Sequence, residues 1–416
     1  MAPASPVTQA LRAESAARAV LGSPLYRGAT IALFLSGLGT SAAAPQLVLF
    51  LVNDLHVSLT TAGLYYLTNI TAPVAGYLIG RRSDRTGARL ALFRLCALAG
   101  FAGWLAISLS TRAWLPFAIS AVVLAFAGGA ASQLFAAIHD ELKATGNPAG
   151  DGVISIVRMA LTAGWVVGPV CGSLLAADVG LRPMLAATAC CTLAQAIPLG
   201  LIRVAPAPAP AGPAPEREAE ARRAARRTGR RAMLPLLAFT GLYVLVYAGE
   251  PIKYGYLPIY MRDDLHLPAG VSGSVIGIQP LIELALMPVA VIVARRVGMT
   301  RLMIAGAAFG VGANLCFALT GDAAGMFAGQ VLMGGVWGVF AALGIIVAQR
   351  LLPHAIATAS AVFMSSTALA SALGGLSGSL GVSVLGLPHA FLIPALYGAI
   401  ATIGMTVMSR SRHAVR

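Results

Sequence analysis

The sequence predicts an all-α integral membrane protein in which twelve transmembrane helices form two pseudo-symmetric six-helix bundles. Three observations support this fold class. Of the 416 residues, 58% are hydrophobic and only 11% are charged, whereas a soluble domain is about one quarter charged. Twelve apolar runs are long enough to cross the hydrocarbon core, which takes about 20 residues. One long polar segment divides these runs into six and six.

Each apolar run is expected to be a helix, because backbone that faces lipid must satisfy its own hydrogen bonds. The runs also lack the alternation of polar and apolar residues that barrel strands show. In chain order, the expected helices cover residues 29–52, 60–80, 90–110, 114–138, 154–177, 183–203, 233–261, 269–294, 300–320, 324–350, 356–383 and 387–409.

The domain boundaries follow from these runs. Residues 1–28 and 410–416 are the terminal segments, and residues 29–203 and 233–409 are the two bundles. Residues 204–232 form a linker, which begins with Ala-Pro repeats that should be extended and ends with an Arg-rich part.

The orientation follows from the distribution of Lys and Arg, which favour the cytoplasmic side. With the N-terminus inside, the inner segments hold 23 of these residues, and the outer loops hold only Arg112, Arg182 and Arg262. We therefore expect a multi-pass protein of the inner cell membrane with both termini in the cytoplasm. Topology and lipid contact account for the net charge of +14, so no nucleic-acid partner is expected. We expect a monomer.

The two halves carry traces of a duplication. Asp54-Leu55-His56 recurs as Asp264-Leu265-His266, 210 positions later, and at the same offset Gly39 matches Gly249 and Asn69 matches Gln279. Repeats at equivalent places indicate a duplicated unit. Parallel six-helix halves of this kind bind substrate at their interface, near the middle of the membrane.

The loop after the second run, Gly80–Arg89, reads GRRSDRTGAR. A tight turn needs the backbone freedom of Gly87, and Asp84 can cap the next helix or pair with an Arg. The spacing of Gly80, Asp84, Arg85, Gly87 and Arg89 resembles the Gly-x-x-x-Asp-Arg-x-Gly-x-Arg signature of the major facilitator superfamily. That resemblance implies a cytoplasmic latch that gates the two helix bundles.

The fifth run contains Gly164, Gly168, Pro169 and Gly172. Small residues at four-residue spacing let helices approach closely, and the proline can bend the helix. Close packing alone explains the pattern. It also resembles the Gly-Pro motif that many exporters of the superfamily carry on their fifth helix, which implies export rather than import.

A narrower resemblance rests on longer stretches, namely SQLFAAIHDEL (132–142), VRMALTAGWVVGPVCGSLL (157–175), YLPIYMRDDLHLP (256–268), IGIQPLIELALMP (276–288) and VARRVGMTRLM (293–303). These look like the sugar efflux transporter family. The resemblance implies export of sugars and glycosides in exchange for protons, and it matches Arg158 and Glu283 to an Arg and an acid of the family. Glu250 and Lys253 depart from it, because relatives carry uncharged residues there.

Three ionisable residues lie at membrane depth, where each costs about 2.5–3.5 kcal/mol. Glu250 is about 4–5 Å and Lys253 about 9 Å from the middle of the run 233–261, while Glu283 is about 2–3 Å from the middle of the run 269–294. Glu250 and Lys253 are one helical turn apart, so they either neutralise each other or line a polar cavity. If Lys253 is charged, one acid remains as the proton site, either Glu283 or Glu250.

Arg158 either lines the inner cavity or reaches the cytoplasmic interface, and His139, Asp140 and Glu141 are expected to partner Arg158 or the Arg-rich turn. Uncharged polar residues at membrane depth suit a sugar, which needs amides to bond and aromatic faces to stack on. They also serve to join helices. The amides are Gln46, Asn69, Gln133 and Gln279, and the tyrosines include Tyr65 and Tyr254, with Tyr66, Tyr243, Tyr247 and Tyr256 also available.

The sequence thus predicts a secondary active transporter that exports sugars, glycosides or sugar-containing small molecules by alternating access. A proton gradient would drive it, with lipid and a small-molecule substrate as its partners. The alternative is multidrug or antibiotic efflux. A membrane-embedded enzyme or a sensor is a remote alternative, because no nucleophile constellation is present. The five cysteines lack metal or disulfide spacing, so no cofactor and no metal is expected.

Overall fold

The computed structural model describes residues 16–146, 149–200, 202 and 230–410, and this part of the chain consists of helices and contains no strand. Ten helical segments in it are long and apolar enough to cross a membrane. The all-α membrane fold is therefore confirmed. The ten segments are Pro24–Asn53, Arg89–Ser108, Leu115–Thr145, Gly152–Val179, Met233–Asp264, Ala269–Val297, Met299–Leu319, Ala323–Leu351, Thr358–Leu385 and His389–Arg410.

The two other expected spans, at 60–80 and 183–203, are helical but interrupted. Proline stands in the first turn of the later piece of each, and its missing N–H favours a new helix start there. The pieces are α4 (Leu59–Gly63), the 3₁₀ segment η1 (Leu64–Thr71), α5 (Ala72–Thr86), α11 (Leu181–Ala194) and the 3₁₀ segment η3 (Ile197–Leu199).

Several long spans are built from more than one element. Up to residue 179 the other elements are α2 (Pro24–Ala43), α3 (Leu47–Asn53), α6 (Arg89–Ser108), α7 (Leu115–Ile119), the π-helical η2 (Ser120–Leu124), α8 (Ala125–Ala127), α9 (Ala130–Thr145) and α10 (Gly150–Val179). From residue 230 they are α13 (Arg230–Tyr247), α14 (Gly249–Asp263), α15 (Ala269–Val297), α16 (Met299–Leu319), α17 (Ala323–Leu351), η4 (Pro353–Ala355), α18 (Ile356–Met364), α19 (Ser366–Leu385), η5 (His389–Phe391) and α20 (Leu392–Arg410).

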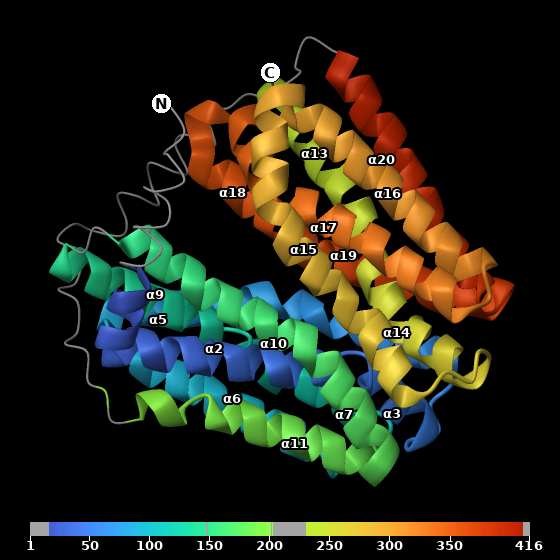
Figure 1. Cartoon of the computed structure of the whole chain (residues 1–416), viewed down its shortest axis with the longest axis horizontal. Helices are drawn as coiled ribbons and strands as arrows, with labels where there is room; N and C mark the ends of the chain where they lie inside the picture. Colours follow the sequence, from blue (N-terminus) through green and yellow to red (C-terminus); the bar gives the residue numbers. More distant parts are fainter. Residues whose placement is uncertain (1–15, 147–148, 201, 203–229, 411–416) are drawn as a thin grey trace. The chain divides into compact units, whose positions relative to one another are not determined.

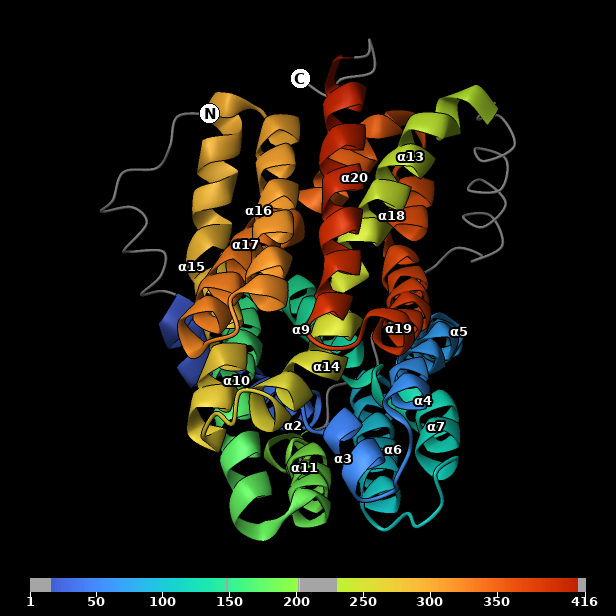
Figure 2. The ribbon, with the colours of Figure 1, turned by 90° about the vertical axis from the view of Figure 1, so that its right-hand side faces the viewer.

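The described residues form two compact units. The described residues within Met1–Ala43 and Thr71–Ala209 form unit 1, and those within Ala44–Ile70 and Pro210–Arg416 form unit 2. In unit 1, α2 packs along α10 and α6 along α11 (Figure 1). In unit 2, α17 packs against both α15 and α16, and α16 packs against α20 (Figure 2). Both cores are apolar, with Phe93 in unit 1 and Phe317 in unit 2 fully buried.

Residues 44–70 belong to unit 2, although the sequence places them in the first bundle. Their helices α3 and α4 pack against α14, and α4 also packs against α19. Gly63 makes this approach possible, because any side chain there would meet the hydroxyl of Tyr256. The Ser379 hydroxyl donates to the carbonyl oxygen of Thr60 at 2.7 Å, which ties α19 to α4. The expected span 29–52 therefore contributes to both units.

The two Asp-Leu-His segments, on which the predicted duplication rests, have the same local conformation. Among the described non-glycine residues, only His56 and His266 have positive φ, at 53° and 49°. The backbone bonds around them correspond as well. Leu55 N–H donates to Phe50 and Val57 to Leu51, just as Leu265 donates to Tyr260 and Leu267 to Met261. The helix before each segment therefore ends in the same way, with a histidine in the left-handed conformation.

This conformation gives a first prediction. We expect His266→Val to destabilise the protein by about 1–2 kcal/mol, because a β-branched residue is strained at positive φ. His266→Gly should be close to neutral, since glycine adopts this region freely. Thermal unfolding of the purified variants in detergent measures both effects. Equal unfolding temperatures for the two variants would contradict the expectation.

Candidate functional site

A buried ion pair lies at the start of α14. The ammonium of Lys253 is 2.8 Å from both carboxylate oxygens of Glu250. Lys253 is fully buried and Glu250 is 9% exposed. The three-residue spacing on one helix brings the two side chains together, and Pro251 is tolerated because it occupies the first turn of α14. The predicted pairing of Glu250 with Lys253 is confirmed.

Two side chains from other helices complete this cluster. Lys253 donates to the amide oxygen of Gln279 on α15, and the indole N–H of Trp337 on α17 donates to Glu250 Oε1 at 2.7 Å. Both residues are buried. Buried charges persist when they are paired and hydrogen-bonded. We call Glu250, Lys253, Gln279 and Trp337 the central cluster.

No pattern in the sequence singles out Trp337. It lies in a glycine-rich apolar run, MGGVWGVF, which looks like ordinary helix packing. The one property that suggests a polar contact for Trp337 is its indole N–H, because a buried tryptophan N–H usually donates to an acceptor. An acid on another expected span was the available acceptor, but nothing in the sequence shows which spans are neighbours.

Glu283 is in a different position from Glu250. It lies one turn after Gln279 on α15 and is half-buried. Its carboxylate forms no hydrogen bond or ion pair with any residue that the structure describes, but it interacts electrostatically with Glu250 and Lys253. With Lys253 already paired to Glu250, the three groups together carry one uncompensated negative charge when all are ionised.

Aromatic rings surround these charges. Tyr247 meets Trp337 edge to face with ring centroids 4.9 Å apart, and Tyr243 contacts both Trp337 and Phe363, at 6.4 and 4.6 Å. The Tyr254 ring centroid is 4.3 Å from the Lys253 ammonium, which permits a cation–π contact. These rings supply flat apolar faces and hydroxyl groups next to the two acids.

The other predicted polar residues of unit 2 have different neighbours. Asn69 is exposed and donates to the Ser371 hydroxyl at 3.4 Å. Tyr65 is buried and meets Tyr66 edge to face at 5.9 Å. Gln46 is buried immediately before α3. Of the four predicted amides, the structure brings only Gln279 into hydrogen-bonding contact with the central cluster.

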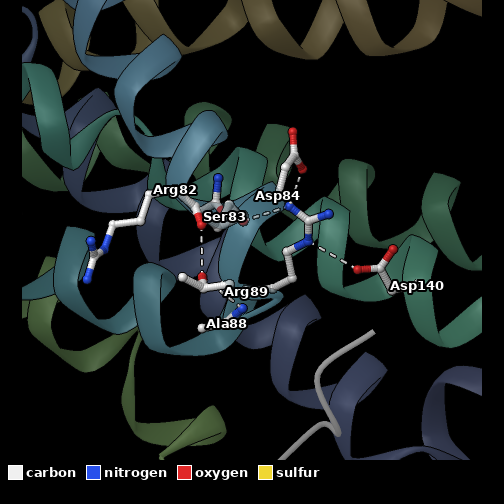
Figure 3. Close-up of polar contacts among 8 residues, drawn as sticks. Arg82, Ser83, Asp84, Ala88, Arg89 and Asp140 are labelled. Atoms are coloured by element: carbon white, nitrogen blue, oxygen red, sulfur yellow. Dashed lines mark hydrogen bonds and ion pairs between the residues drawn. The ribbon is translucent and has the colours of Figure 1, made fainter. Parts of the chain in front are cut away.

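The Arg-rich turn of unit 1 is organised by Arg89 (Figure 3). Its guanidinium donates to Asp84 at 2.8 Å and to Asp140 on α9 at 3.1 Å. It also donates to the Ser83 hydroxyl at 2.7 Å. The predicted pairing of Asp84 with an Arg is confirmed, as is the pairing of Asp140 with this turn. Together these contacts hold the end of α5, the start of α6 and α9 in one network.

The turn itself depends on Gly87, which has a φ of 64° and ends α5 in the left-handed conformation. Glycine adopts this region without strain, as predicted. Gly80 has open space where a side chain would lie, and Arg85 is exposed. The packing around Gly80 thus does not require glycine.

Gln133 and Arg158 were both candidates for a substrate cavity, with helix joining as the alternative role for Gln133 and the cytoplasmic interface as the alternative for Arg158. Gln133 is buried, and its amide oxygen accepts a hydrogen bond from Ser83, so it supports the Arg89 network. Arg158 is exposed on α10, and its guanidinium carbon is 5.9 Å from the Phe135 ring centroid. Both residues belong to unit 1, whereas the central cluster belongs to unit 2.

The glycines of α10 allow close contact with α2. A Cβ at Gly164 would lie 2.6 Å from the Leu38 nitrogen, one at Gly168 2.6 Å from the Leu38 oxygen, and one at Gly172 2.6 Å from the Ala42 oxygen. The Ser41 hydroxyl, which donates to the Gly164 carbonyl at 3.1 Å, depends on the same approach. Pro169 lies inside α10 and is buried. The predicted close packing is confirmed.

Comparison with known proteins agrees with this architecture. The family model of the Major Facilitator Superfamily matches residues 29–254 and 239–415. A relative from Deinococcus radiodurans is 27% identical over 393 residues, which is 94% of this chain and 99% of that protein. Sugar efflux transporter A of Dickeya chrysanthemi is 26% identical over 339 residues, covering 80% of this chain and 83% of that protein.

Among solved structures, the nucleoside transporter NupG is similar in fold, with a TM-score of 0.78 and 16% identity. The match covers 93% of this chain and 100% of the NupG chain. At this identity the likeness concerns the fold alone. The family match, in contrast, extends over nearly the whole sequence in two segments that overlap at residues 239–254. The chain therefore belongs to the major facilitator superfamily of membrane transporters.

Proposed function

We propose that this transporter exports sugars, glycosides or sugar-containing small molecules in exchange for protons. The observation that carries the proposal is the arrangement of acids in unit 2, where Glu250 is fully paired and Glu283 is not. The names of the curated relatives, sugar efflux transporters, support the substrate class. The tyrosines beside the acids add the aromatic faces and hydroxyl groups that a glycoside needs.

The coupling proton is assigned to Glu283. Glu250 accepts hydrogen bonds from Lys253 and Trp337, so its carboxylate already has a counter-ion and donors. An unpaired carboxylate at membrane depth is costly, so Glu283 gains most from taking up a proton. Exchange of that proton between the two sides of the membrane would couple the pH gradient to substrate movement.

The transport cycle would be alternating access by two six-helix bundles of twelve transmembrane helices. The interrupted spans at residues 59–86 and 181–199 would supply the two helices beyond the ten long ones. The contacts of residues 44–70 with α14 and α19 would close the outer side, given an inner membrane location with both termini in the cytoplasm. Rocking of the bundles would break these contacts and open that side.

Transport in proteoliposomes tests the proposal. We expect an imposed pH gradient to drive glycoside movement through the wild-type protein. Glu283→Gln should abolish the acceleration by the gradient, because glutamine cannot take up a proton, and should retain exchange of labelled for unlabelled substrate. A gradient that moves no glycoside, or one that drives the Glu283→Gln variant equally well, would refute the mechanism.

The aromatic surroundings of Glu283 also favour a second candidate, the export of apolar drugs or antibiotics. The rings of Tyr243, Tyr247, Trp337 and Phe363 lie in mutual contact and would suit a flat apolar molecule. Competition distinguishes the candidates. Inhibition of glycoside transport by other sugars supports the first, and inhibition only by aromatic drugs supports the second.

The Arg89 network gives a further prediction. We expect Asp140→Asn to lower the transport rate by up to about fivefold, because loss of up to about 1 kcal/mol from one conformation changes the population ratio by that factor. Its effect on stability should stay below about 1 kcal/mol, as for other partly exposed ion pairs. Initial transport rates and thermal unfolding measure the two effects. Glu141→Gln is the matched control, since the neighbouring Glu141 makes no ion pair with a described residue, and an equal loss in both variants would contradict the latch.

A further inference from the structure

Unit 2 contains two buried amide side chains whose hydrogen bonding is incomplete. Gln330 on α17 is 0% exposed and Asn314 on α16 is 3% exposed. Both the nitrogen and the oxygen of the Gln330 amide lack a partner among the described residues, as does the oxygen of Asn314. The Asn314 nitrogen donates to the Gly310 carbonyl at 2.8 Å. Buried amides of this kind are almost always bonded, to protein or to ordered water.

The two amides lie at the same level of adjacent helices. A Cβ on Gly329 would be 3.0 Å from the Ala313 oxygen, so α17 and α16 are in contact at these two residues. Gln330 directly follows Gly329, and Asn314 directly follows Ala313. Gln330 is seven residues into α17 and Asn314 five residues before the end of α16. At 1.5 Å per residue, both are about 8–11 Å from the α16–α17 turn.

The same level adjoins the central cluster. A Cβ on Gly249, the residue before Glu250, would be 3.9 Å from the Asn314 side-chain nitrogen. Gln330 and Trp337 are seven residues apart on α17, so they share one helix face two turns apart, with Met333 between them. Trp337 in turn donates to Glu250. Asn314 therefore lies beside the residue that precedes Glu250, and the face of α17 that carries Gln330 reaches Trp337 after two turns.

We propose that Gln330 and Asn314 bind ordered water between α16 and α17, and that this water is the proton route from the α16–α17 turn to the central cluster and Glu283. The amides offer two donors and several acceptors, enough for the two to four bonds that a buried water makes. A proton enters the water chain at the turn and another leaves it at the acid, so the water itself is unchanged. The role as a route rests on the proposed proton coupling, whereas the water site does not.

The alternative is that the amides are simply unpaired. In that case apolar replacements of similar shape would be neutral or stabilising and would leave transport unchanged. Thr240→Val is the matched control, because the Thr240 hydroxyl in the same unit is also buried without a partner among the described residues. The test variants are Gln330→Met and Asn314→Leu.

Radiolytic hydroxyl-radical labelling of the intact protein detects the water directly. Met333 and Met303 are almost equally buried, at 4% and 1%, but only Met333 lies next to Gln330 on α17. We expect Met333 to be oxidised several times faster than Met303, and Gln330→Met to remove the difference at Met333. Equal and slow labelling of Met333 and Met303 overturns the water site.

Transport separates the route from the coupling itself. In Gln330→Met and Asn314→Leu we expect transport driven by a pH gradient to fall by about 100-fold, the lower end of what positioned proton transfer contributes. Substrate exchange without a gradient should persist, and Thr240→Val should behave as wild type. If Met333 is labelled rapidly but gradient-driven transport is unchanged in Gln330→Met and Asn314→Leu, the proton route is refuted. If a pH gradient does not accelerate transport by the wild-type protein, both the proton coupling and the proton route are refuted. The labelling of Met333 still decides whether the water site exists.

Discussion

Lys253→Met will destabilise the transporter by about 3–5 kcal/mol, because it leaves the carboxylate of Glu250 buried without its counter-ion. The Lys253 side chain is fully buried and donates to both Glu250 oxygens and to Gln279. Methionine fills a similar volume, so the lost charge rather than a cavity accounts for the effect. Thermal or denaturant unfolding in detergent measures it.

Two further variants show whether the charge is responsible. Lys253→Met combined with Glu250→Gln removes both charges, so it should recover most of the lost stability. Trp337→Phe removes the indole hydrogen bond to Glu250 and part of a buried ring. We expect about 1.5–3 kcal/mol from the lost bond to a charged group, with a cavity cost in addition. A loss below about 1 kcal/mol in the single lysine variant would contradict a buried charged pair.

Gly168→Ala will destabilise the protein by about 1–3 kcal/mol, the usual cost of overpacking. A Cβ there would be 2.6 Å from the Leu38 oxygen and would also meet the Ser41 hydroxyl. Because the obstacle includes backbone, α2 and α10 would have to move apart along their shared face. That movement would also disturb the bond from Ser41 to the Gly164 carbonyl.

The matched control is Gly241→Ala in α13. Gly241 has no heavy atom within 4 Å of its Cβ position, so alanine should raise stability by up to about 1 kcal/mol through its better helix propensity. The same substitution is thus expected to act with opposite signs at the two positions. Unfolding temperatures that move in the same direction for both variants would contradict the close packing of α2 and α10.

The candidate site could be predicted only in part, and its residues show why. The Glu250–Lys253 pair follows from the sequence because both residues lie on one helix at a spacing that faces them together. Trp337 is 87 positions from Glu250, and no local pattern connects them. For the same reason Gln133 looked like a cavity residue, although its partner Ser83 is 50 positions away on another helix.

The sequence by itself determined the all-α membrane fold, most of its helical spans and the glycine turn after α5. These depend on properties of short stretches, namely the transfer of apolar runs into lipid and the backbone freedom of Gly87. Tertiary structure decided which side chains meet. It joined residues 44–70 to unit 2, gave Arg89 the partners Asp84 and Asp140, and left Glu283 unpaired among the described residues. Contacts between distant helices arise from packing in three dimensions, which a linear pattern of hydrophobicity does not specify.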